Sequence, residues 1–223
     1  MRSGLRRLSV IGLILVMMIS MLAGCKSTPK PEDAQAYVKA VLDLMCTGDY
    51  DHSVKLADVE EGTEAEVREN LISDMMTQIG TEANLNEEVS NSFKDFMLNA
   101  LEKSKYTVGD AVQTDDGGYD VTVSIEPLQL FAGVQEELTK VLEDKVSEDP
   151  NTILAMSQDE QTNYVMGILI EILNKKLEDP QYDAAEEVVV HYGPMEGQDN
   201  VYGCAESEGE KLGAKLFSSF GLE

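Results

Sequence analysis

The pattern that most constrains this fold is a regular alternation of apolar and polar residues around one turn. Residues 119–125 alternate strictly, and before them Tyr106, Val108 and Val112 alternate with polar residues. Between the two segments, Asp115-Asp116-Gly117-Gly118 supplies two glycines that readily adopt positive φ. Because successive side chains of a strand point to opposite faces, each segment has one apolar and one polar face. The sequence therefore predicts an antiparallel hairpin that covers a core.

Helical patterns lie on both sides of this hairpin. Apolar residues recur every three or four positions, a spacing typical of helices with one buried face. Ser157-Gln158-Asp159-Glu160 has the form of a capping box and opens one of these helices. The predicted helical segments are residues 32–47, 63–79, 86–104, 130–142, 158–177 and 207–220.

A second β-rich segment precedes the last predicted helix. Residues 188–192 are rich in valine, and residues 201–204 read as a short return strand after a loop with Pro194 and Gly197. Helices and antiparallel strands that are segregated along the chain favour the α+β class. We therefore expect amphipathic helices packed on one face of an antiparallel sheet of about four strands, built from two hairpins.

The N-terminal segment has the features of an export signal. Three arginines and no acid precede an apolar run over residues 8–22, which ends in Leu22-Ala23-Gly24-Cys25. A basic flank, a short apolar run and small residues are typical of a secretory signal peptide. A permanent membrane span needs about 20 apolar residues, and this run is shorter.

Leu22-Ala23-Gly24-Cys25 resembles the lipobox of bacterial lipoproteins. The resemblance implies that Cys25 receives diacylglycerol, that residues 1–24 are removed as a signal peptide and that the protein is held by membrane lipid. Residues 25–31 would form a lipidated, proline-containing tether, and residues 32–223 one extracytoplasmic α+β domain on the cell membrane. The alternative is an ordinary signal peptide in which the cysteine occurs by chance.

The charge of the chain excludes one class of partner. The 42 Asp and Glu outnumber the 17 Lys and Arg, and no tryptophan is present. Such an acidic surface repels the phosphate backbone of DNA and RNA. We therefore expect no nucleic-acid binding. The acids are distributed over many predicted helices, which is typical of a solvated surface.

Two cysteines remain once Cys25 is assigned to lipid. Cys46 lies late in the first predicted helix, and Cys204 ends the last predicted strand. An exported protein with an even remainder of cysteines permits a disulfide, so Cys46 and Cys204 are candidates for a bridge. The alternative is two small buried thiols.

The order of elements resembles lipoproteins of Gram-positive bacteria whose activity is unknown, some of which carry cystatin-like or NTF2-like α+β domains. The lipobox, the opening helix over residues 34–45 and the strands over residues 106–112 and 119–125 carry this resemblance. The resemblance implies a location and one lipidated residue, Cys25. It implies no catalytic residue.

Motifs for common chemistries are missing from the sequence. It contains no H-E-x-x-H, no G-x-S-x-G and no glycine-rich phosphate loop. We therefore expect no enzyme, no cofactor and no metal. His191, Tyr192 and Tyr202 are candidates for lining a pocket on the open face of the sheet, and a solvated cross-strand pair is the alternative for His191.

The sequence thus favours a non-catalytic lipoprotein that binds an unidentified protein or small molecule. The alternatives are a solute-binding accessory subunit of a transporter and an enzyme of the cell envelope. A pocket lined by aromatic residues would favour a small ligand, and two facing buried carboxylates would favour an enzyme. An exposed apolar patch would favour a protein partner.

Overall fold

The computed structural model describes residues 29–54, 56, 62–70, 72–73, 84–149, 155–195 and 201–216. The apolar run, Leu22-Ala23-Gly24-Cys25 and most of the predicted tether lie outside this part. So do residues 71, 74–79 and 217–220 of two predicted helices. Within the described part, no helix combines the length and the apolar character needed to cross a bilayer. Lipidation of Cys25 stays a prediction.

One antiparallel sheet contains four strands in the order β1-β2-β3-β4. The strands are β1 (Lys105–Gln113), β2 (Tyr119–Glu126), β3 (Glu186–Pro194) and β4 (Tyr202–Cys204). The two predicted hairpins are β1–β2 and β3–β4, and pairing of β2 with β3 joins them. The α+β class and the sheet of four strands are therefore confirmed.

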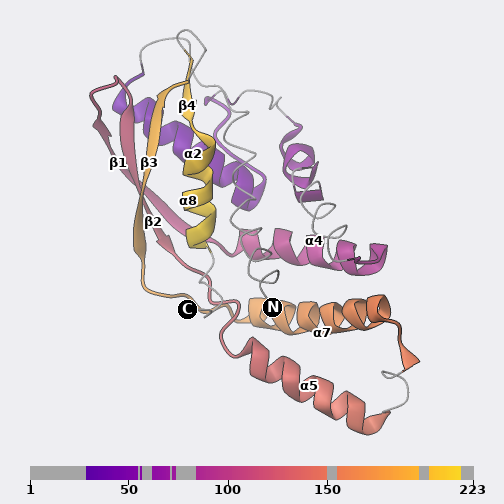
Figure 1. Ribbon diagram of the computed structural model, residues 1–223. Coiled ribbons are helices and arrows are strands. Elements are labelled where there is room, and N and C mark those ends of the chain that lie inside the picture. The colour runs from indigo at the N-terminus through magenta and orange to yellow at the C-terminus, as the bar shows by residue number, and fades with distance from the viewer. Residues whose placement is uncertain are drawn as a thin grey trace.

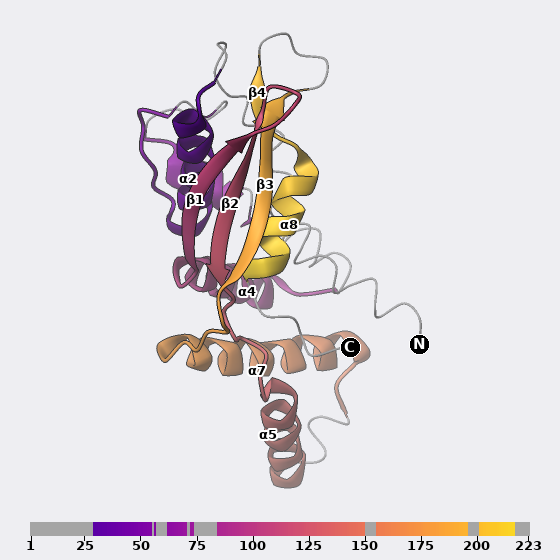
Figure 2. The ribbon, with the colours of Figure 1, turned by 90° about the vertical axis from the view of Figure 1, so that its left-hand side faces the viewer.

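The sheet buries only one of its faces. On β2, every second side chain from Tyr119 to Ile125 is buried, and the side chains between them are partly exposed. Two helices, α2 (Pro31–Thr47) and α8 (Glu206–Leu216), cover the buried face. No described helix lies in front of the other face, which Figure 2 shows towards the viewer. The alternation in the sequence reflects this one-sided burial.

The central helix of the core is α2. Ala34 and Leu42 on its inner face are fully buried against the sheet and the neighbouring helices. Gly48 ends the helix with a φ of 76°, a left-handed conformation that favours glycine, and the predicted segment over residues 32–47 ends at the same place.

Three further helices form a second layer beyond one end of the sheet. They are α4 (Glu87–Glu102), α5 (Val134–Glu148) and α7 (Gln158–Glu178), with α7 between the other two (Figure 1). We call α4, α5 and α7 the helical layer. Ser157 and Glu160 make the predicted capping box at the start of α7.

The helix α5 begins later than its apolar pattern suggested. Leu130 and Phe131 precede the helix, because Gly133 has a φ of 71° and Leu128 pairs with Tyr182 in an isolated bridge. Only Val134 of α5 is fully buried. The outermost helix is therefore held at its first turn and along one half-buried face.

Candidate functional site

The open face of the sheet carries a histidine between two carboxylates. His191 on β3 lies directly opposite Asp120 on β2, and its Nδ1 is 2.8 Å from Asp120 Oδ1. Its Nε2 is 3.0 Å from Oδ2 of Asp116, which lies in the β1–β2 turn. We call these three residues the histidine clasp. Because both ring nitrogens contact a carboxylate, the clasp ties the turn to β3.

Two glycines provide the space for the histidine clasp. A Cβ on Gly193 would collide with Nε2 of His191. A Cβ on Gly118 would lie 2.6 Å from the carbonyl oxygen of Tyr192. The first side chain would displace the imidazole ring, and the second would push two strands apart.

Protonation of His191 is favoured within the clasp. Burial opposes the charged ring, but the hydrogen bond to Asp120 and the charge of Asp116 outweigh it and raise the pKa of His191 above its ordinary value of 6.5. Hydrogen bonds from the Thr114 hydroxyl and the Gly118 N–H lower the pKa of Asp116. An imidazolium with both nitrogens engaged has no free nitrogen to accept a proton from a substrate. This arrangement is suited to an ion pair that fixes a turn.

No metal site accompanies the histidine clasp within the described residues. No group of three or more His, Cys, Asp or Glu side chains in this part of the chain could hold a metal ion.

The three residues that the sequence assigned to a pocket do not converge. His191 faces the open side of the sheet, as the alternation predicted, and it forms a cross-strand pair with Asp120. Tyr192 points into the core, where it is 1% exposed and its ring centroid is 4.9 Å from that of Tyr37. Tyr202 stacks on Tyr192 at 6.3 Å. Neighbouring residues of a strand point to opposite faces, so one pocket cannot include both His191 and Tyr192.

The two cysteines are buried as free thiols, and the bridge that the sequence allowed is not formed. The backbone of Cys204 hydrogen-bonds to the Tyr37 hydroxyl, whereas Cys46 lies nine residues further along α2. Nine residues of helix rise by about 13 Å, so Tyr37 and Cys46 lie at different levels of α2. Burial is the largest cause that raises the pKa of Cys46, to about 12.

A groove of about 620 Å³ lies in the helical layer, between the N-terminal halves of α4 and α7. The side-chain amide of Asn163 on α7 fastens the two helices together. Its oxygen accepts a hydrogen bond from the N–H of Asn86 at 2.7 Å, and its nitrogen donates to the carbonyl of Asn84 at 3.0 Å. The walls of the groove are therefore fixed relative to one another.

The groove combines apolar walls with an acidic rim. Leu85 and Val89 line it on the side of α4, and Tyr164 and Ile168 line it on the side of α7. Its acidic residues are Glu88, Asp159, Glu160 and Glu171, and no Lys or Arg is among the described residues that line it. This set of side chains suits a ligand that is both apolar and cationic.

Sequence reasoning did not identify this groove. Asn84 and Asn163 are 79 residues apart, and the patterns of α4 and α7 indicate only that each helix has an apolar face. The one local signal was Gly167, which lies in the middle of a long helical pattern. Glycine is unfavourable inside a helix, so its presence there indicates a position where a side chain is not needed for packing.

The fold is similar to that of one solved bacterial protein. The match is to the crystal structure of a putative lipoprotein (ycdA) from Bacillus subtilis, with a TM-score of 0.58 and 10% sequence identity. It covers 84% of this chain but 56% of that protein, so this chain spans just over half its length. No family model and no curated protein sequence matches the chain. The similarity shows a shared fold, and the lipobox and the cystatin-like or NTF2-like resemblance stay predictions.

Proposed function

We propose that this protein is a lipid-anchored, extracytoplasmic binding module without catalytic activity. The observation that carries the binding role is the groove between α4 and α7, a concavity with apolar walls. Leu22-Ala23-Gly24-Cys25 supports the anchor, with Cys25 as the lipidated residue. The shared fold with a protein described as a putative lipoprotein supports the same location.

The position of Pro29 indicates how the anchored protein would face the membrane. Its carbonyl accepts a hydrogen bond of 3.1 Å from the hydroxyl of Tyr119, the first residue of β2 after the β1–β2 turn. Pro29 lies four positions after Cys25, a reach of about 13 Å when extended. A lipid on Cys25 would therefore hold the turn end of the sheet close to the bilayer.

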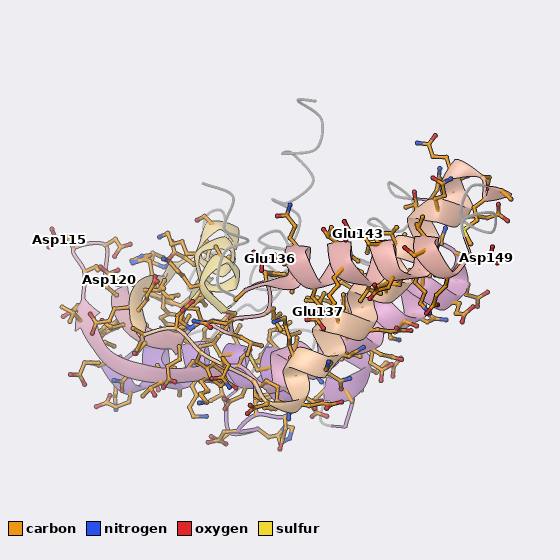
Figure 3. The ribbon with its side chains drawn as sticks, turned by 90° about the horizontal axis from the view of Figure 1, so that it is seen from below. Asp115, Asp120, Glu136, Glu137, Glu143 and Asp149 are labelled. Atoms are coloured by element: carbon orange, nitrogen blue, oxygen red, sulfur yellow. The ribbon has the colours of Figure 1, made fainter. Side chains whose placement is uncertain are left out.

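The helical layer would then extend away from the membrane. In Figure 1 the start of α2 lies near one end of the molecule and α5 at the opposite end. Figure 3 shows Glu136, Glu137, Glu143 and Asp149 along α5, far from the turn that carries Asp115.

The histidine clasp supports a role without catalysis. Both nitrogens of His191 are engaged, and the carboxylates of Asp116 and Asp120 are 48% and 46% exposed. The clasp therefore differs from a buried, facing pair of carboxylates, in which one member acts as a general acid.

The anchor is tested by replacing Cys25 and fractionating the cells. Cys25→Ala should move the protein from the membrane fraction to the medium, and mass spectrometry of the wild type should find diacylglycerol on the N-terminal fragment. Cys46→Ala is the matched control and should leave the protein in the membrane fraction. An unchanged distribution of Cys25→Ala would contradict the anchor.

The binding role is tested by chemical cross-linking on intact cells. One reproducible protein partner of the wild type, reduced by Glu171→Gln on the groove and retained by Glu143→Gln on α5, supports an interaction module. Identical cross-links for both variants would contradict a role for the groove.

A further inference from the structure

The groove between α4 and α7 has the shape of a site for a linear chain. Glu160 and Glu171 both line it on α7 and are eleven residues apart. Eleven residues of helix extend over about 16 Å, which is the length of about five residues of extended peptide. The groove is therefore long enough for a short peptide segment.

Gly167 makes the groove deeper at its midpoint. A Cβ at this position would meet no atom of the described residues within 4 Å, so internal packing does not require a glycine here. Glycine weakens a helix interior relative to alanine. The absent side chain leaves open space beside Tyr164 and Ile168, where the aliphatic part of a lysine or arginine could lie.

The charge of the groove indicates the sign of its ligand. Four carboxylates line it, while the N-termini of α4 and α7 together contribute a positive charge of about one unit, so the site is net negative. Residues 74–83 and 150–154, which precede the lining residues Asn84 and Met156, contain no Lys or Arg in the sequence. A cation placed over the ring of Tyr164 would gain further attraction.

The groove is also formed before any ligand binds. The amide of Asn163 holds the start of α4 against α7 through two hydrogen bonds. The Ser157–Glu160 capping box fixes the first turn of α7. Because these walls need no rearrangement, a ligand loses less affinity to ordering of the site.

We propose that this groove binds a basic amphipathic segment of a protein partner. Apolar residues of the segment lie between α4 and α7, and a Lys or Arg stem lies over Gly167, with cations near Glu88 and Glu171. This inference rests on the proposed function, since it specifies the partner that the binding module recognises.

The test measures the affinity of a defined probe for the full-length protein in non-ionic detergent. The probe is a fluorescent decapeptide of alternating lysine and leucine, followed by fluorescence anisotropy, with a glutamate–leucine decapeptide as the control for sign of charge. Gly167→Leu, which fills the groove without changing charge, should weaken binding about tenfold or more. Its melting temperature should equal or exceed that of the wild type.

Charge variants separate the groove from the general acidity of the protein. Glu171→Gln should weaken binding several-fold, whereas Glu143→Gln, which removes the same charge from α5, should have little effect. Equal weakening by both variants would overturn the proposal, and so would wild-type affinity of Gly167→Leu. A lower melting temperature of Gly167→Leu would also overturn it, because the groove would then be occupied by the chain itself.

The Cys25→Ala protein distinguishes failure of this inference from failure of the anchor. It should bind the lysine–leucine peptide with the affinity of the wild type, because the groove does not include the tether. If Cys25→Ala stayed in the membrane fraction and still bound the peptide, the anchor would be overturned. The proposal that the groove binds the peptide would be unaffected.

Discussion

The sheet with its two covering helices and α5, the outermost helix of the helical layer, differ in how completely they are buried. Val121, Val123 and Ile125 on β2 and Leu42 on α2 have no exposed surface. In the helical layer, α5 fully buries only Val134, and Leu138, Val141 and Leu142 are partly exposed. The free energy that holds a helix to a protein depends mainly on the apolar surface it buries. The sheet side is therefore a stable scaffold, and α5 is held less strongly than the elements that pack under the sheet.

This difference is matched by a difference in chemistry. On the sheet side, the histidine clasp uses its charged groups to hold a turn. In the helical layer, the carboxylates around the groove have no basic partner among the described residues that line it. Charged groups that satisfy one another stabilise a fold, and unbalanced groups around a concave apolar surface favour binding of a ligand.

The largest expected effect is the loss of a core side chain under the sheet. Leu42→Ala should lower the free energy of unfolding by about 2–5 kcal/mol, since Leu42 is completely buried and a cavity would remain. Urea unfolding followed by circular dichroism measures the change. If Leu42→Ala lowered the free energy of unfolding by less than Leu138→Ala on α5 does, the comparison between the two regions would be reversed.

A close backbone contact should give the next largest effect. Gly118→Ala should cost about 1–3 kcal/mol, because its Cβ would lie 2.6 Å from the backbone oxygen of Tyr192 and only a shift of the strands can relieve that contact. Gly193→Ala is the control, since its Cβ meets the movable ring of His191. Thermal unfolding should therefore show a smaller loss for Gly193→Ala than for Gly118→Ala.

A side chain of α5 should matter less than one beneath the sheet. Leu138→Ala removes a half-buried side chain and should cost about 1 kcal/mol. Proteolysis within α5 should become faster in this variant while β2 stays protected. A cost as large as that of Leu42→Ala would mean that α5 is as firmly held as the scaffold.

The smallest expected effect is the pH dependence of the histidine clasp. The raised pKa of His191 means that its contribution to stability is complete below about pH 6.5 and is lost as pH rises through the folded-state value. Because the ring is 36% exposed, the contribution should be at most about 1 kcal/mol. The stability difference between wild type and His191→Asn should therefore shrink from pH 6 to pH 9. An increase over that range would contradict the ion pair.

The elements that the sequence predicted correctly depend on local patterns. The β1–β2 hairpin follows from the alternation along β2 and the two glycines before it, although a bulge between Val108 and Ala111 interrupts β1. The predicted end of the first helix at residue 47 agrees with the end of α2. Local patterns were less informative at α5, where the positive φ of Gly133 excludes Leu130 and Phe131 from a helix that their spacing favoured.

The sites depend on contacts between distant residues. Alternation placed His191 on the open face, but its contact with Asp116 spans 75 residues and depends on the register of β2 with β3. The groove depends on contacts of Asn163 with residues 77 and 79 positions away. A single sequence contains the residues of such contacts without showing which of them meet.

Amide hydrogen exchange of the full-length protein, with and without the lysine–leucine peptide, tests the division between scaffold and binding region most directly. Without peptide, amides of β2 should exchange slowest and those of α5 among the fastest. With peptide, exchange should slow at residues 84–89 and 158–171 and stay unchanged in β2 and β3. Equal protection of α5 and β2 without peptide, or slowing confined to the sheet with peptide, would contradict the account.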